Sequence, residues 1–341
     1  MTWLQVVWFL LVGVLFTVFA ILDGFDLGVG FWYLGSKGDK ERRTLLNAVG
    51  PVWDGNEVWL LTGGGALFAA FPPVYASVFS GFYLAMMLLL LALISRAVSL
   101  EFRSKEESTT WRSTWDVVFS VSSILGGLLF GVALGNILRG ITLNEAGDYT
   151  GTFLALLNPY ALLIGVLGLT MLAFHGANFI VLKAPGDLAV RARRWSLGAG
   201  MVYLALYIVA SGVTIATQPH LMENFSFAPV LWAIPILALA FIAAALFFSK
   251  NDKPGKAFLF SSLSIAGMMG VTGAALFPRF VPALGSPELS LTAANSSSSE
   301  LTLKTMFILA VIGVPIVLAY TIWVYKAFGG KVDVDQESNH Y

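Results

Sequence analysis

Nine long apolar stretches separate the charged residues of this 341-residue chain. Each is close to or above the ~20 residues that an α-helix needs to cross the hydrocarbon core of a membrane. Lipid offers no hydrogen bonds to the backbone, and the ~10-residue alternating strands of a membrane barrel are absent, so we expect nine transmembrane α-helices. The stretches lie near residues 3–34, 52–72, 77–97, 115–138, 155–181, 195–217, 228–249, 257–278 and 304–327.

Lysine and arginine alternate between the connections that join these stretches. Seventeen of the 20 lie in the odd-numbered connections and the tail, and only Arg139, Arg279 and Lys304 lie in the even-numbered ones. Positively charged loops stay in the cytoplasm. The pattern predicts an N-terminus outside, a C-terminus inside and a cytoplasmic tail over residues 328–341. The seventeen are Lys37, Lys40, Arg42, Arg43, Arg96, Arg103, Lys105, Arg112, Lys183, Arg191, Arg193, Arg194, Lys250, Lys253, Lys256, Lys326 and Lys331.

The composition agrees with a membrane protein. Hydrophobic residues make up 57% of the chain and charged residues 12%, about half the ~25% of a soluble domain. The formal net charge is zero, so no basic excess points to nucleic acid. Cysteine is absent, which excludes disulfides, iron–sulfur clusters and thiolate metal sites. The apolar start lacks a basic region, so we do not expect a cleavable signal peptide. The polar segment at about 279–300 predicts an outer loop.

A weak internal repeat suggests how the helices are grouped. Asp23-Gly24, late in the first helix, is followed by Gly38-Asp39, and His175-Gly176, late in the fifth helix, is followed by Gly186-Asp187. The two helices run in the same direction, which favours two parallel four-helix units side by side. The prediction is one all-α membrane domain with a first bundle at 1–138, a second at 155–278 and a ninth helix at 304–327.

Ionisable residues inside membrane helices are the main functional clue, because each costs about 3 kcal/mol to insert. Asp23 and Asp26 lie three residues apart, on one face of the first helix. Asp54, Asn56 and Glu57 lie at the inner end of the second helix, which a short connection places beside the first. We expect the four carboxyl groups to converge near the cytoplasm and to form a protonatable cluster suited to proton uptake.

Two interpretations of these acids that involve no proton transfer are also open. They can be hydrated at the membrane interface, or they can pair with Arg42 and Arg43. Asp116, near the start of the fourth helix, is interpreted as interfacial.

Histidine is scarce, which limits the redox chemistry of the chain itself. The three histidines are His175 in the fifth helix, His220 in an outer loop and His340 in the tail. Bis-histidine haem or copper sites need pairs that face each other. We interpret His175 as a hydrogen-bonded helix contact rather than a ligand, and we expect no metal ligand and no catalytic residue in this chain.

Several motifs closely resemble subunit II of cytochrome bd quinol oxidase, and together they cover essentially the whole chain. They are DGFDLGVG at 23–30, WDGNEVW at 53–59, TGGGALFAAFP at 62–72, SGFY at 80–83, RSK at 103–105, WR at 111–112, WD at 115–116, NP at 158–159 and HGA at 175–177.

The resemblance implies a heterodimer of this chain with a haem-bearing subunit I, often joined by a small single-helix accessory subunit. In that family two haems b, one haem d and the quinol site belong to subunit I. The complex, which lies in a bacterial or archaeal cytoplasmic membrane, oxidises quinol and reduces dioxygen with protons from the cytoplasm.

By motif, the resemblance places Asp23, Asp26 and Asp54 on a proton route toward the oxygen-reducing haem. Trp59 matches a tryptophan near an apolar oxygen route or a structural quinone in some members. Some members have glutamine in place of Glu57 and of His175, which makes Glu57 a less secure member of the proton route and weakens an essential role for His175.

Two other functions fit the residues. A proton-coupled secondary transporter would also carry intramembrane acids, although inverted repeats and broken helices would be expected there. A pure scaffold subunit would leave all the chemistry to its partner.

Overall fold

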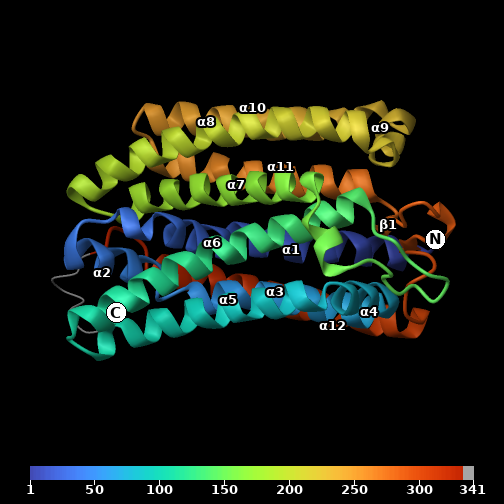
Figure 1. Cartoon of the computed structure of the whole chain (residues 1–341), viewed down its shortest axis with the longest axis horizontal. Coiled ribbons are helices and arrows are strands. Elements are labelled where there is room, and N and C mark those ends of the chain that lie inside the picture. Colours follow the sequence, from blue (N-terminus) through green and yellow to red (C-terminus); the bar gives the residue numbers. More distant parts are fainter. Residues whose placement is uncertain (333–341) are drawn as a thin grey trace.

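The structure, a computed structural model, describes residues 1–332 and is almost wholly helical (Figure 1). The long helices run nearly parallel to one another along the longest axis of the molecule. The helices are α1 (Trp3–Trp32), α2 (Gly38–Val49), α3 (Trp53–Ala70), α4 (Pro72–Gly81), α5 (Tyr83–Phe102), α6 (Thr109–Arg139), α7 (Pro159–Lys183), α8 (Gly186–Thr217), α9 (Glu223–Phe227), α10 (Ala233–Lys250), α11 (Pro254–Leu276) and α12 (Glu300–Ala327). The predicted all-α membrane fold is confirmed.

Eight helices in the described part of the chain are long and apolar enough to cross a membrane, namely α1, α5, α6, α7, α8, α10, α11 and α12. The predicted stretch at 52–72 forms α3 but is not among them, because its first turns carry Asp54, Asn56 and Glu57. A ninth span therefore remains a prediction.

The third predicted span was misplaced. The stretch 77–97 falls on two helices, because α4 ends at Gly81 and α5 starts at Tyr83. Pro72 and Pro73 lie in the first turn of α4, where the missing N–H of proline is harmless, so α3 ends just before them. The apolar span is Tyr83–Lys105, so Arg96, which was counted with the connection that follows, lies well inside the helix.

The first connection holds structure that was not predicted. Residues 38–49 form the amphipathic helix α2, whose last six residues are buried. This helix and the α5–α6, α7–α8 and α10–α11 connections lie at one end of the molecule, on the left in Figure 1. This end, called the inner end below, carries most of the lysine and arginine. Its assignment to the cytoplasm remains a prediction.

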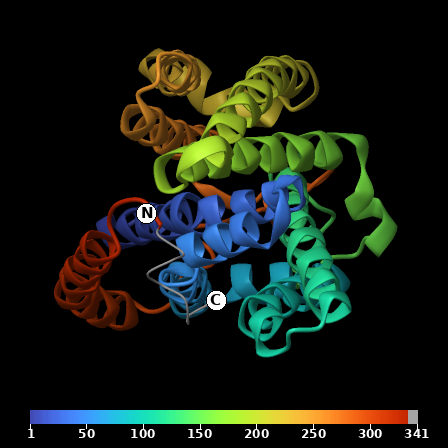
Figure 2. The ribbon, with the colours of Figure 1, turned by 90° about the vertical axis from the view of Figure 1, so that its left-hand side faces the viewer.

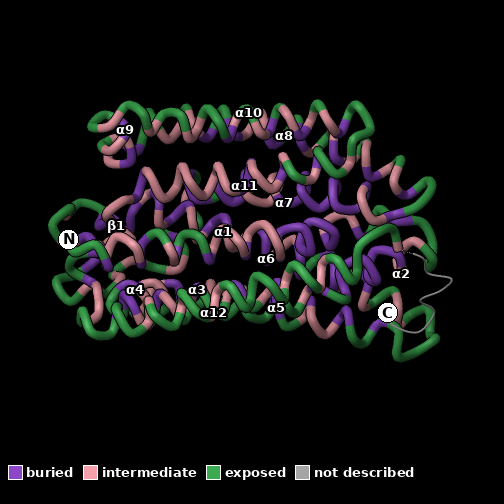
Figure 3. Tube along the Cα trace, turned by 180° about the vertical axis from the view of Figure 1, so that it is seen from behind, coloured by how far each residue is buried: buried purple, intermediate pink, exposed green. Residues whose placement is uncertain are grey.

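Helices α1 and α7 lie at the centre of the packing. Helix α1 contacts α3, α6, α7 and α11, while α7 contacts α6, α8 and α11. Figure 3 shows buried residues concentrated along these helices and exposed ones along α10 and α12. Figure 2 shows α12 at the edge, and Leu303 is its only buried residue. The contacts within α1–α6 and within α7–α11 follow the predicted groups, but extensive α1–α7 and α6–α7 contacts join them, so the division into two bundles remains a prediction.

Glycine allows two of these close approaches. A Cβ at Gly176 of α7 would lie 2.3 Å from the carbonyl carbon of Gly28 in α1. A Cβ at Gly131 of α6 would lie 2.8 Å from Cα of Gly165 in α7. The glycines of the DGFDLGVG and HGA segments thus let α1 and α7 touch by their backbones.

The polar segment after α11 is ordered and packed against the helices. Strands β1 (Arg279–Val281) and β2 (Leu291–Thr292) pair antiparallel, with Arg279 opposite Thr292. The Ser298 N–H donates to the Ala70 carbonyl at 2.8 Å, which ties the segment to the end of α3. Residues 333–341, most of the predicted tail, lie outside the described residues.

Candidate functional site

Two of the predicted acids, Asp23 and Glu57, bind an arginine that was predicted to lie in a connection between helices. Arg96 projects from α5 with only 1% of its side chain exposed. Its Nη2 donates to Asp23 Oδ1 at 2.7 Å and to Glu57 Oε2 at 3.1 Å. Asp23 is fully buried, whereas Glu57 keeps 21% of its side chain exposed. Arg96 therefore joins α1, α3 and α5 through a buried ion triad.

Asp26 lies one turn further along α1 and is held by an amide. The Asn56 Nδ2 donates to Asp26 Oδ2 at 2.8 Å and to the Leu22 carbonyl at 3.3 Å. The Tyr325 hydroxyl, from α12, donates to Asn56 Oδ1 at 2.7 Å. Asp26 and Asn56 are each 2% exposed, so the bond between them is buried, whereas Tyr325 is half-buried.

We call Asp23, Asp26, Asn56, Glu57 and Arg96 the acid–arginine cluster. It holds three carboxyl groups and a single guanidinium, which binds two of them. Four of its buried polar atoms have no partner among the described residues: Asp23 Oδ2, Asp26 Oδ1, Arg96 Nε and Arg96 Nη1. Buried polar atoms almost always have a protein or water partner. Water can therefore bind at these four atoms, and the two carboxyl oxygens can take up a proton.

Pairing of the acids with Arg42 and Arg43 was the alternative left open, but the carboxylates of Asp23 and Glu57 bind Arg96 instead. The sequence did carry a signal, since four further residues, Ala97 to Leu100, separate Arg96 from the next charge. The predicted convergence is buried only in part, because Asp23 and Asp26 are buried while Asp54 is exposed at the start of α3.

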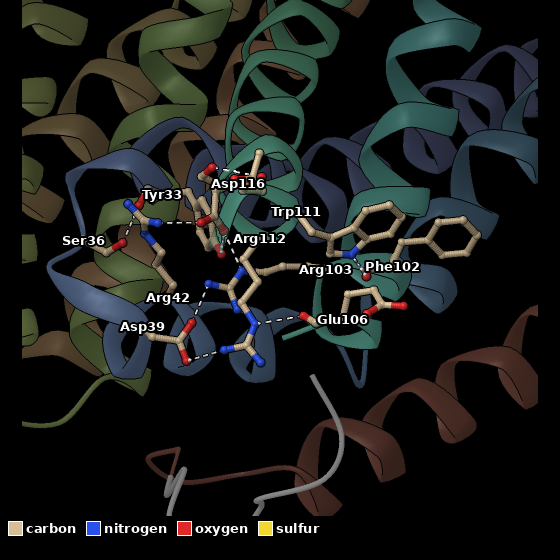
Figure 4. A network of polar contacts seen from close by, with 12 residues as sticks. Tyr33, Ser36, Asp39, Arg42, Phe102, Arg103, Glu106, Trp111, Arg112 and Asp116 are labelled. Atoms are coloured by element: carbon tan, nitrogen blue, oxygen red, sulfur yellow. Dashed lines mark hydrogen bonds and ion pairs between the residues drawn. The ribbon is translucent and has the colours of Figure 1, made fainter. Parts of the chain in front are cut away.

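Asp116 was predicted to be interfacial, but it is 1% exposed and binds three side chains (Figure 4). Its Oδ1 accepts from Tyr33 Oη at 2.6 Å and from Arg103 Nε at 2.6 Å, and its Oδ2 accepts from Arg42 Nη1 at 2.5 Å. The sequence could not show this, because α2 has to fold back over α5 and α6 to bring Arg42 here.

Arg103 extends the same network to the surface. Its Nη2 donates to Asp39 Oδ1 at 2.7 Å, and Arg112 Nη1 lies 3.7 Å from Asp39 Oδ2 (Figure 4). Partial burial disfavours the charged carboxylate, but the bond to Arg103 and the nearby charges of Arg112 and Arg43 outweigh it and lower the pKa of Asp39. This network holds α2 against α5 and α6 at the inner end.

His175 is a helix contact, as predicted. It is fully buried, and its Nδ1 lies 2.7 Å from Ser261 Oγ in α11 and its Nε2 lies 3.0 Å from the Ile21 carbonyl of α1. The ring stacks on Phe258, with centroids 4.7 Å apart. Both ring nitrogens thus make hydrogen-bonded contacts to neighbouring helices. His220 Nε2 contacts the Leu138 carbonyl at 2.9 Å, and His340 lies outside the described residues.

Trp59 lies in an apolar cluster with Leu15 and Phe19, beside Phe130. It is 5% exposed, one turn beyond Asn56 on α3. Within residues 1–332, no group of three or more His, Asp or Glu side chains is arranged to hold a metal ion.

Comparisons with known proteins point to one family. The model of the family described as "Cytochrome bd terminal oxidase subunit II" matches residues 4–328. "Cytochrome bd-I ubiquinol oxidase subunit 2" from Escherichia coli (strain K12) is 40% identical, covering 98% of this chain and 97% of that protein. "Cytochrome bd ubiquinol oxidase subunit 2" from Bacillus subtilis (strain 168) is 37% identical, covering 95% and 96%.

A solved structure shares the fold. A chain of the bd oxidase from Geobacillus thermodenitrificans superposes with a TM-score of 0.79 at 15% identity, covering 96% of this chain and 99% of that one. The family match over nearly the whole length and the 40% identity agree with the motifs of the sequence, and the chain therefore belongs to the cytochrome bd terminal oxidase subunit II family.

Proposed function

We propose that this chain is the subunit of a quinol:dioxygen oxidoreductase that binds no haem itself. It pairs with a subunit I that carries two haems b and one haem d, stabilises that subunit and brings protons to the oxygen-reducing haem from the cytoplasm. A small single-helix accessory subunit, membrane lipid and a structural quinone complete the proposed assembly. The family and the relatives named as ubiquinol oxidase subunits support this function.

The acid–arginine cluster carries the proposal of a proton route. A scaffold has no need for three carboxyl groups at a buried site, because burying charges costs free energy even when they are paired. Ionisable groups at membrane depth commonly mark proton or ion pathways. The three acids can hold different numbers of protons while Arg96 stays charged, which is what a site that stores and passes protons requires.

The positions of the acids suggest a direction. Asp54 is exposed at the inner end of α3, where a negative charge attracts protons from water. Asn56 and Glu57 lie within the next turn of α3, and Asp26 and Asp23 follow on α1. The proposed route runs from the surface at Asp54 toward the buried cluster.

An oxygen route is a second proposed role. The apolar cluster of Trp59, Leu15 and Phe19 provides a non-polar environment in which dioxygen dissolves better than in water. The same tryptophan is the candidate contact for a structural quinone.

The test is oxygen-electrode turnover per haem in intact complexes that carry Asp26→Asn or Asp54→Asn. Loss of a proton-transferring group lowers rates by about 10²-fold or more, so turnover should fall at least tenfold while haem content and quinol KM stay nearly unchanged. Asp187→Asn is the matched control, because Asp187 is an exposed acid in the first turn of α8.

The outcomes separate the alternatives. Poor assembly with loss of haem would favour the scaffold. Wild-type turnover in fully assembled Asp26→Asn and Asp54→Asn complexes would refute the proton route. A complex purified through this chain without haem would favour the transporter.

A further inference from the structure

A cavity of about 100 Å³ lies at the inner end, beneath the end of α12. Its walls come from α2, α7, α12 and the segment that follows α12. That segment is held in place, because Lys183 Nζ donates to the Phe328 carbonyl at 2.5 Å and the Val332 N–H donates to the Lys183 carbonyl at 2.9 Å. The cavity is therefore a defined part of the fold.

The cavity wall contains a polar side chain suited to water. Asn47 of α2 is 5% exposed, and neither its Oδ1 nor its Nδ2 has a partner among the described residues. A single water needs only ~10–15 Å³ of such space and two or more polar partners. The volume and the free amide of Asn47 together indicate a hydrated cavity.

Tyr325 connects this cavity with the acid–arginine cluster. It lines the cavity, and its hydroxyl donates to Asn56 Oδ1 of the cluster at 2.7 Å. Asn56 then donates to Asp26 Oδ2 at 2.8 Å. A side-chain amide does not readily pass a proton, so Asn56 holds Asp26 in place rather than relaying. The bond occupies Oδ2 and leaves Oδ1, which has no described partner, as the oxygen that takes a proton.

We propose that this cavity, whose lining includes Val52 two residues before Asp54, is the water-filled inner mouth of the proton route, and that Tyr325 is the positioning residue between it and Asp26. This proposal rests on the proposed proton route and specifies where it starts and what aligns it. A proton that water carries from this cavity to the cluster bonds to Asp26 Oδ1, and the hydronium ion that gives it up becomes water. Helix α12, which has one buried residue, thereby acquires a role in the reaction.

The test uses Tyr325→Phe in the intact complex, which keeps the ring and removes the hydroxyl. Tyr320→Phe is the matched control, since Tyr320 is on the same helix and 62% exposed. Two quantities are measured: the rate of proton uptake during a single turnover, and the infrared C=O band that disappears in Asp26→Asn. We expect Tyr325→Phe to slow uptake about fivefold, the factor that corresponds to a hydrogen bond of about 1 kcal/mol, and to shift the band.

Asn47→Leu tests the mouth without touching the cluster. It replaces the polar wall of the cavity with an apolar side chain and should slow uptake while leaving the infrared band in place. It also keeps the proposal testable if Tyr325→Phe complexes lose haem.

The results separate the role of Tyr325, the role of the cavity and the proton route itself. Slow uptake in Asp26→Asn, with wild-type uptake and an unshifted band in Tyr325→Phe, would overturn the role of Tyr325 and leave the route standing. Wild-type uptake in assembled Asn47→Leu would overturn the mouth. Wild-type uptake in Asp26→Asn would refute the route, and this inference with it.

Discussion

Removing the charge of Arg96 should destabilise the complex in a pH-dependent way. Arg96→Gln leaves Asp23, which is fully buried, and Glu57 without their cation. Breaking a buried ion pair by removing one partner costs about 3–5 kcal/mol. The carboxyls can avoid part of that cost by taking up a proton. Protonating an aspartate at pH 7, from a reference pKa of about 3.9, costs about 4 kcal/mol. This cost is similar to the cost of breaking the buried ion pair.

The direction of the pH effect follows from how many protons the folded and the unfolded states of the variant bind. In the variant, the folded state holds a proton on the cluster that the unfolded state lacks. The free energy of unfolding should therefore rise by about 1.4 kcal/mol for each unit that the pH falls, from about pH 8 toward pH 5. In the native protein the guanidinium of Arg96 stabilises the ionised carboxylate, so the dependence on pH should be weaker.

The assay is the temperature at which the purified complex loses its haem absorbance at pH 6, 7 and 8. The double variant Asp23→Asn with Arg96→Gln removes both charges and should recover at least half of the loss. Arg112→Gln, whose side chain is 32% exposed, is the control for removing an arginine at the inner end. An Arg96→Gln complex with wild-type stability at all three pH values would refute the reasoning.

Four further outcomes are expected. Gly176→Ala should lower the yield of assembled complex, with a cost of about 3 kcal/mol from overpacking against Gly28, whereas Gly198→Ala, which meets nothing within 4 Å, should not. His175→Gln should retain haem and near-normal turnover, with a stability loss of about 1 kcal/mol, and a large fall in turnover would contradict its role as a helix contact. The chain expressed without its partner should contain well below one equivalent of haem in a pyridine haemochrome spectrum. A reporter fused after Gly330 should be cytoplasmic, and an external signal would contradict the predicted topology.

The sequence by itself determined the helical membrane class, the approximate bounds of most spans, the family resemblance and the acids on α1. These properties depend on local quantities, because each segment enters lipid according to its own hydropathy, and the motifs are contiguous. The separate helices α2 and α4 were missed, because the hydropathy averaged over a window does not show a short amphipathic helix or a break at Phe82.

Only the tertiary structure decided which charges pair. Arg96 and Asp23 are 73 residues apart in sequence, and Tyr325 and Asn56 are 269 apart. Such pairs depend on helix rotation and on which helices are neighbours, and a rotation of one helix by a single residue would turn Arg96 toward lipid. The structure placed Asp54 at the surface, placed Asp116 in a buried network and connected α12 to Asp26 through Asn56. The reason is physical, since ion pairs and hydrogen bonds act over about 3 Å, and no pattern along the chain specifies distances on that scale.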